Sequence, residues 1–155
     1  METSKAVYVS PIGTIEIVGT PENILALNFV EGEPEADARV PDCLLSCVEQ
    51  IDEYFKGNRK VFSLPLKTEG TAFQQQVWRQ LERIPYGAVA SYGDVARAIG
   101  KPKACRAVGS ANHSNPIALI IPCHRVIGAD GTLTGYGGGL WRKEWLLNLE
   151  ANRLG

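Results

Sequence analysis

The stretch SYGDVARAIGKPKACRAVGSAN, residues 91–112, decides how the second half of this 155-residue chain folds. Ser91, followed three residues later by Asp94, is a capping arrangement that begins a helix, and Gly100 ends that helix. After a short turn, a second helix is expected over residues 103–112. Two helices joined by a short turn that contains glycine are typical of a helix-turn-helix, although many ordinary helical hairpins share the pattern.

Another helix is expected immediately before this stretch, over residues 71–81. Phe73, Val77 and Trp78 recur on one of its faces. It ends ahead of Pro85, because proline excludes the residue before it from the helical region.

The first part of the chain has the pattern of a small sheet with one helix. Residues 6–9, 14–18 and 25–30 are short, apolar and β-branched, and turn residues separate them. This predicts a three-stranded antiparallel meander. From Pro41 onward, apolar residues recur at spacings of three and four, as on an amphipathic helix that ends near Gly57.

The sequence pattern changes near residue 65, from strands and one helix to mainly helices. Just before this change, residues 61–66 could form another strand. We therefore expect an α+β fold with two domains. Residues 1–66 would form a small N-terminal α/β supporting domain, an antiparallel sheet with a helix. Residues 67–155 would form a mainly helical C-terminal domain that contains the helix-turn-helix and carries the function.

Charge is distributed unevenly along the chain. The formal net charge is −1, so any surface for nucleic acid has to be local. Between residues 79 and 125 only Glu82 and Asp94 are acidic, and we expect this stretch to contact phosphates. Its basic residues are Arg79, Arg83, Arg97, Lys101, Lys103, Arg106 and Arg125.

The second helix of the pair is slim. Small side chains such as those of Ala107 and Ser110 would let it press closely into a groove, with Arg106 as its longest projection. Together with the basic stretch, this favours DNA as the partner over the alternative of a solvated pair of helices.

Farther along lies IIPCHRVIG, residues 120–128, an apolar run that ends abruptly in cysteine, histidine and arginine. A cysteine is a nucleophile only as its thiolate. An adjacent imidazole, a nearby guanidinium and a turn with free N–H groups favour that form. The apolar approach predicts a buried strand that holds the sulfur of Cys123 in place. The alternative is an inert buried thiol, since free cysteines are among the most buried residues.

The remaining composition is that of an intracellular protein. No apolar stretch approaches the length of a membrane span, and the N-terminus is no signal peptide, so we expect a cytoplasmic protein without membrane contact. The four cysteines show no disulfide spacing. Cys43 and Cys47 lie four residues apart on an expected helix, where apolar packing is favoured over a metal site because further ligands are lacking.

The second half also contains a series of short motifs in a definite order. They are Ser91-Tyr92-Gly93, Arg106-Ala107-Val108-Gly109, Asn115-Pro116, Ile121-Pro122-Cys123-His124-Arg125-Val126, Gly135-Tyr136, Gly138-Gly139-Leu140, Lys143-Glu144-Trp145-Leu146-Leu147 and Glu150. In this series the chain resembles the O6-alkylguanine-DNA alkyltransferases. The first half is similar to that family only in its strand-and-helix pattern, which implies an RNase H-like arrangement.

The resemblance implies DNA repair by direct reversal of damage. The protein would bind duplex DNA that contains O6-alkylguanine, flip the damaged base out of the stack and transfer its alkyl group to Cys123. O4-alkylthymine would be a further substrate. The transfer would be irreversible and stoichiometric, because the thioether product has no leaving route. The resemblance implies a methyltransferase that acts as a monomer. It implies no cofactor, no metal ion and no obligate protein partner.

By the same resemblance, five residues would take part in the chemistry. Cys123 would be the nucleophile, its proton would pass through a water to His124, and Glu150 would orient the imidazole. Tyr92 would press on the phosphate backbone and then donate a hydrogen bond to the leaving guanine. Asn115 would brace the loop that carries the cysteine.

Other residues would bind the base and the DNA. Arg106 would fill the space that the flipped base leaves, and the helix with Lys103, Ala107 and Ser110 would enter the minor groove. The backbone carbonyls of Cys123 and Val126 would recognise the exocyclic amine, and the N–H of Gly137 would serve the O6 atom. The residues implied for binding the base are Arg106, Val126, Tyr136, Gly137 and Lys143.

Three positions depart from the family's human member. Gly137 stands where that protein has serine, Ala118 where it has proline, and Thr134 where it has glycine. We expect a pocket altered toward other alkyl sizes and poorly reactive with free benzylated guanine.

Three alternative functions stay open. A non-catalytic alkylated-DNA-binding protein of the alkyltransferase-like class shares the DNA-binding features but lacks the cysteine. A thiol hydrolase would use Cys123 with His124, although the partners in such enzymes usually come from distant positions. A transcription regulator would use the helix-turn-helix alone, but no ligand-sensing or dimerisation segment is apparent.

Overall fold

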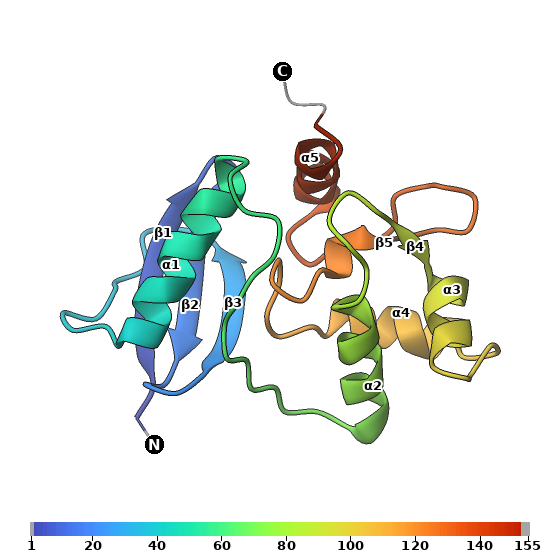
Figure 1. Cartoon of the computed structure of the whole chain (residues 1–155), viewed down its shortest axis with the longest axis horizontal. Coiled ribbons are helices and arrows are strands. Elements are labelled where there is room, and N and C mark those ends of the chain that lie inside the picture. The colour runs from blue at the N-terminus through green and yellow to red at the C-terminus, as the bar shows by residue number, and fades with distance from the viewer. Residues whose placement is uncertain (1, 153–155) are drawn as a thin grey trace. The chain divides into compact units, whose positions relative to one another are not determined.

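The computed structural model describes residues 2–152, and the chain divides between Thr68 and Glu69 into two compact units. The sequence pattern places this division slightly earlier, between residues 66 and 67. The outermost residues of the two expected domains, 1 and 153–155, lie outside the described part of the chain. Figure 1 shows the sheet of the first unit and the helices of the second.

The first unit is an antiparallel sheet covered by one helix, as predicted. Strands β1 (Ser4–Ser10), β2 (Gly13–Gly19) and β3 (Ile24–Val30) pair in chain order. Alternate residues of β2 are buried, which puts its apolar side chains on one face of the sheet. Helix α1 (Asp42–Phe55) packs against that sheet (Figure 1). The fully buried core residues of this unit include Ile15, Ile17, Leu27, Leu44, Ile51 and Tyr54.

The strand expected over residues 61–66 does not form, so that prediction is wrong. This segment has a single bridge to the sheet, between Leu66 and Ile24. Pro65 accepts a hydrogen bond from the N–H of Ile24, but it has no N–H of its own to extend a ladder. Earlier in the same segment, the side chain of Gln50 forms hydrogen bonds with both the backbone N–H and the backbone carbonyl of Ser63. These groups therefore have a side-chain partner in place of a neighbouring strand.

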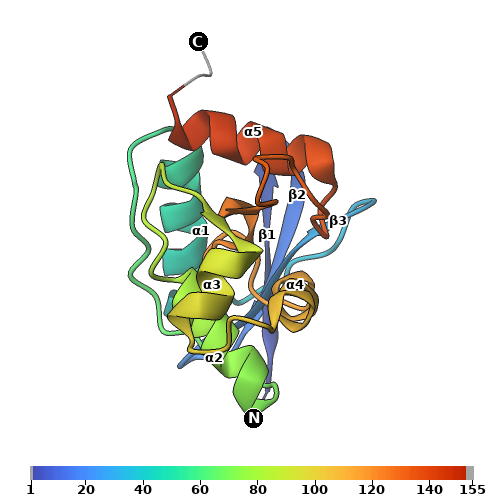
Figure 2. The ribbon, with the colours of Figure 1, turned by 90° about the vertical axis from the view of Figure 1, so that its right-hand side faces the viewer.

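The second unit contains the three predicted helices, α2 (Ala72–Leu81), α3 (Tyr92–Ala98) and α4 (Cys105–His113), which pack against one another (Figure 2). The caps explain where they begin. Thr71 and Ser91 each accept from a backbone N–H three residues on, and in both caps the side chain at that position reaches back. Helix α4 begins later than expected because residues 101–104 close a turn instead, and its N-cap has no side-chain hydrogen bond.

Two short strands and a final helix complete this unit. Strand β4 (Ala90–Ser91) pairs in parallel with β5 (Val126–Ile127), and helix α5 (Leu140–Glu150) follows. The strand pair links the segment just before α3 to the segment just after Cys123. Strands of two residues carry no periodicity, which is why the sequence pattern did not reveal them.

The apolar run before Cys123 is buried but is not a strand, so that prediction is also wrong. Leu119 has a positive φ of 72°, and the N–H groups of Ile120 and Ile121 bond back to the carbonyls of residues 118 and 117. The run is a set of tight turns that leads into a short 3₁₀ helix, η1 (Cys123–Arg125). Apolar runs of this length do not by themselves distinguish a buried strand from other buried backbone. In residues 2–152, no helix is long and apolar enough to cross a membrane.

Candidate active site

Cys123 is the first residue of η1, and only 6% of its surface is exposed. Two amide side chains from the C-terminal end of α4 and just beyond hold the backbone around it. Asn115 Nδ2 donates to the carbonyl of Ile121 at 2.8 Å, and Asn112 Nδ2 donates to that of Cys123 at 3.4 Å. Asn115 is itself held, because its Oδ1 accepts from the N–H of Ile117 at 3.0 Å. These bonds couple the position of the sulfur to the end of α4.

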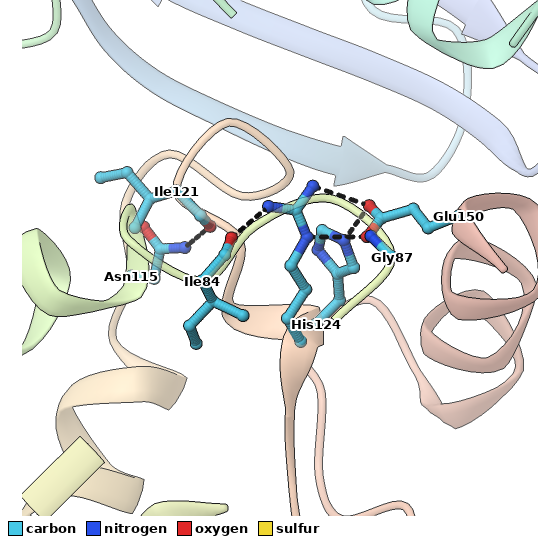
Figure 3. A network of polar contacts seen from close by, with 7 residues as sticks. Ile84, Gly87, Asn115, Ile121, His124 and Glu150 are labelled. Atoms are coloured by element: carbon cyan, nitrogen blue, oxygen red, sulfur yellow. Dashed lines mark hydrogen bonds and ion pairs between the residues drawn. The ribbon is translucent and has the colours of Figure 1, made fainter. Parts of the chain in front are cut away.

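The carboxylate of Glu150, in the last turn of α5, is the centre of a buried network (Figure 3). Its Oε2 is 2.7 Å from His124 Nε2. Arg125 approaches both oxygens, with Nε 2.7 Å from Oε1 and Nη2 3.0 Å from Oε2. The backbone N–H of Gly87 donates to Oε1 at 3.4 Å, and Arg125 Nη1 donates to the carbonyl of Ile84 at 2.7 Å. The network joins η1, α5 and the loop after α2.

Charge balance in this network determines the protonation of His124. Burial by itself would raise the pKa of Glu150, but its hydrogen bonds with His124 and Arg125 outweigh burial and hold that pKa at about 2. The group is therefore a carboxylate that only accepts, and His124 Nε2 must carry the hydrogen that it donates. Burial lowers the pKa of His124, against the opposing effect of Glu150, so the imidazole is neutral near pH 7.

This tautomer leaves His124 Nδ1 with a free lone pair. Among the residues that the structure describes, Nδ1 has no hydrogen-bond partner, although it is buried. A neutral imidazole with one nitrogen bonded to a carboxylate and the other free is the arrangement of a general base.

The thiol of Cys123 is kept protonated at rest. Burial raises its pKa, while the Asn115 amide, the Lys143 charge and nearby backbone N–H groups act in the opposite direction. The guanidinium that we expected to favour the thiolate belongs to Arg125, and it binds Glu150 instead. Lys143 is the cation that acts on the sulfur. Arg125 is also buried, so it does not contact phosphates as we expected for this basic stretch.

The loop before α5 links two further expected site residues. The hydroxyls of Tyr92 and Thr134 share a hydrogen bond at 2.5 Å. The fully buried Lys143 donates from Nζ to the carbonyl of Thr134 at 3.1 Å. Tyr136, in the same loop, is buried, whereas Gly137 is exposed. Thr134 therefore contacts the tyrosine with its side chain and the lysine with its backbone.

The residues expected to contact DNA lie on an exposed face of α4 and immediately before it. They are Lys103, Arg106, Ala107 and Ser110, and all four are exposed. Their spacings of three and four residues put those of α4 on one side of the helix. Val108 and Ala111 are buried on the other side, where α4 packs on α2 and α3. Val126 is buried in β5.

The sequence pattern does not reveal three contributions to the site. Arg125 was assigned to phosphates, and nothing in the linear order pairs it with a carboxylate 25 residues away. The sequence pattern indicates Asn112 only as a helix end and Thr134 only as a departure from the family pattern. No local signal could have found these roles, because each depends on a contact made in three dimensions.

The described residues contain no group of three or more His, Cys, Asp or Glu side chains that could hold a metal ion. Cys47 lies on the buried face of α1, and burial raises the pKa of its thiol to about 12. The burial of Cys47 agrees with the expected apolar packing at this position of the helix.

Both units match known sequence families. Residues 4–68 match the ribonuclease-like domain of 6-O-methylguanine DNA methyltransferase, and residues 72–152 match its DNA binding domain. The match of the first unit is more specific than its strand-and-helix pattern alone had indicated.

Individual proteins are similar over nearly the whole chain. A methylated-DNA–protein-cysteine methyltransferase of Methanosarcina acetivorans is 48% identical over 154 residues, which cover 95% of this chain and 97% of that one. The crystal structure of the Mycobacterium tuberculosis O6-methylguanine methyltransferase has a TM-score of 0.88 at 44% identity, and the match covers 99% of this chain and 96% of that one. A crystal structure of the M. tuberculosis protein in complex with DNA has a TM-score of 0.87 at 47% identity, covering 95% and 92%.

Proposed function

Because this chain belongs to the 6-O-methylguanine DNA methyltransferase family, we propose that its Cys123 is the residue that accepts the alkyl group from O6-alkylguanine in duplex DNA. The activity of the family is a DNA repair activity, and the chain is a repair methyltransferase. The observation that carries the assignment to Cys123 is its place beside a neutral imidazole whose other nitrogen is bonded to Glu150.

The reaction is a displacement at the alkyl carbon. A bond forms between that carbon and Cys123 Sγ, the bond from carbon to O6 breaks, and its electron pair goes to the leaving guanine. The thiol proton passes through a water to the Nδ1 atom of His124. That atom has no hydrogen-bond partner among the described residues. Glu150 stabilises the imidazolium that results, and Arg125 keeps that carboxylate ionised.

The charge that develops on the leaving guanine needs hydrogen-bond donors. Tyr92 Oη donates to N3 of the base, and the exposed backbone of Gly137 offers its N–H to O6. The Lys143 ammonium stabilises the thiolate while it exists. Because the thioether has no leaving route, each molecule reacts once, and all the groups required come from a single chain.

The lesion reaches Cys123 by leaving the stack, since a base inside a duplex hides its O6 substituent. The exposed face of α4 enters the minor groove, where its small side chains fit closely. Arg106 fills the vacated position, and Lys103 contacts phosphate. A free thiol and access to DNA are both available in the cytoplasm, which we propose as the location.

The decisive experiment is to incubate the protein with a duplex that contains O6-methylguanine and to measure its intact mass and peptide map. We expect one added methyl group per protein, located on Cys123, and unmodified guanine in the DNA. Cys123→Ser should add no methyl, whereas Cys105→Ser, which removes an exposed cysteine, should react normally.

Two outcomes would contradict the proposal. Binding of the duplex with the lesion retained and Cys123 unmodified would indicate a non-catalytic damage-binding protein. Repair of more than one lesion per protein molecule would indicate a turnover enzyme.

A further inference from the structure

The hydroxyl of Thr134 meets the hydroxyl of Tyr92, and the mechanism above gives Thr134 no role. The two oxygens are 2.5 Å apart, and either hydroxyl could be the donor. Tyr92 is the first residue of α3, whereas Thr134 lies in the loop before α5. The proposed function assigns to Tyr92 a hydrogen bond with the leaving guanine. The loop therefore contacts the very group of Tyr92 that is to act on the base.

Both residues of this pair are held by further contacts. The backbone carbonyl of Thr134 accepts a hydrogen bond from Nζ of the buried Lys143 at 3.1 Å. The charge of this lysine also acts on Cys123, so the pair adjoins the reacting centre. The ring of Tyr92 passes close to the backbone of α4, since a Cβ added at Gly109 would lie 3.7 Å from its Cε1 atom. The two hydroxyls are thus held together by three elements of the second unit.

The number of hydrogens fixes the direction of this bond during the reaction. A hydroxyl has one hydrogen to donate and two lone pairs that accept. When Tyr92 donates its hydrogen to N3 of the guanine, it has none left for Thr134. The contact between the two oxygens then persists because Thr134 donates to Tyr92 Oη. Rotation of the two O–H bonds is sufficient for this change, and each hydrogen stays on its own oxygen.

We propose that Thr134 is a positioning residue for the transfer, whose hydroxyl donates to Tyr92 Oη while Tyr92 donates to N3 of the leaving guanine. This inference rests on the proposed function. Negative charge that develops on the guanine polarises the O–H bond of Tyr92, and a donor to the same oxygen stabilises that charge through two successive hydrogen bonds. The contact also holds the phenol in place before the base arrives.

The test compares two lesions in one duplex sequence, O6-methylguanine and O6-methyl-3-deazaguanine, in which a C–H group replaces N3 and cannot accept. The variants are Thr134→Val, which has nearly the same shape without the hydroxyl, and Thr134→Ser, which keeps the hydroxyl. Single-turnover rates of Cys123 methylation are measured. We expect Thr134→Val to lose about fivefold on O6-methylguanine, the value of one neutral hydrogen bond, and little on the deaza lesion. Thr134→Ser should keep most of the wild-type rate on both lesions.

The matched control is Thr132→Val, which removes a hydroxyl of the same loop that bonds to Asp130 and not to Tyr92. Its rates should stay near those of the wild-type protein on both lesions. Methyl lesions isolate the effect of the hydroxyl, because a methyl group does not need the room that a smaller side chain at position 134 would give to a larger substituent.

Equal slowing of Thr134→Val on both lesions would overturn the inference, since Thr134 would then only support the loop. Unchanged rates on both lesions, or slowing that Thr134→Ser shares, would overturn it as well. If Thr134→Val does not fold, Thr134→Ala removes the same hydroxyl, and thermal unfolding identifies which variant to use. Failure of the wild-type protein to methylate Cys123 at all would instead contradict the proposed function.

Discussion

Arg125 forms a two-point ion pair with Glu150, with Nε 2.7 Å from Oε1 and Nη2 3.0 Å from Oε2. The same carboxylate contacts His124, so one buried charge orients the proposed base and is itself balanced by the guanidinium. Without Arg125, the carboxylate would have to take a proton or draw one to the imidazole. Either change would disable His124 as a base.

Replacing Arg125 with methionine should destabilise the protein by about 3–5 kcal/mol, because it leaves a buried carboxylate without its cation. The matched control is Arg59→Met, which breaks the more exposed pair between Arg59 and Glu53 and should cost about 0–1 kcal/mol. Urea unfolding at pH 7 measures both values. Similar losses in the two variants would show that burial of the Arg125 pair has no special effect.

Stability should fall in acid because of the same carboxylate. The pKa of Glu150 is about 2 in the folded chain, against an ordinary value of 4.5. A depressed pKa contributes stability above pH 4.5 that is lost as the pH falls toward 2, in total about 3 kcal/mol. Burial lowers the pKa of His124 from its ordinary 6.5, so protonation of the unfolded chain adds a decline below that pH.

Unfolding free energies measured in urea between pH 7 and pH 3 test this prediction. In Glu150→Gln the part of the decline below pH 4.5 should be missing, because the amide does not titrate. An equally steep decline in that variant would assign the acid sensitivity to other groups.

His124→Gln should slow methylation of Cys123 about 100-fold or more, since it removes the proton acceptor. Its rate should also rise steadily with pH, because burial raises the thiol pKa above its ordinary 9.0 and only solvent can then take the proton. The wild-type rate should be nearly constant above pH 6.5, where His124 is neutral. Single-turnover rates as a function of pH measure this, with His113→Gln, an exposed histidine, as the control. Identical pH profiles for wild type and His124→Gln would exclude His124 as the base.

Thr134→Gly should make the protein more reactive with free O6-benzylguanine, by about tenfold. The substitution removes a side chain that contacts Tyr92 and opens space for the larger substituent. Thr132→Gly loosens the same loop at an exposed position and should have little effect. Inactivation rates with the free base measure the difference. Rapid inactivation of the wild-type protein would contradict the expectation that its pocket disfavours this compound.

Local chemistry was sufficient to predict most elements of the fold. Ser91 and Asp94 form the expected capping box, because a helix cap involves neighbours in the chain. Two segments that the sequence pattern predicts as strands do not form strands. For residues 61–66 the alternative partner was Gln50, a side chain on another element. Before Cys123, the apolar side chains indicated burial, but the positive φ of Leu119 is a backbone property that composition does not reveal.

The sequence by itself determined the family resemblance, the candidate nucleophile and its adjacent imidazole, because these are properties of residues in order. Only the tertiary structure decided which partner each charged or polar group takes. Arg125 was as suited to a phosphate as to a carboxylate, and burial beside Glu150 settled the choice. The unpaired oxygen of Asn112 likewise exists only because folding removes it from water and leaves one neighbour, an acceptor, within reach of the amide. Such pairings join residues far apart in the chain, and packing determines which of them meet.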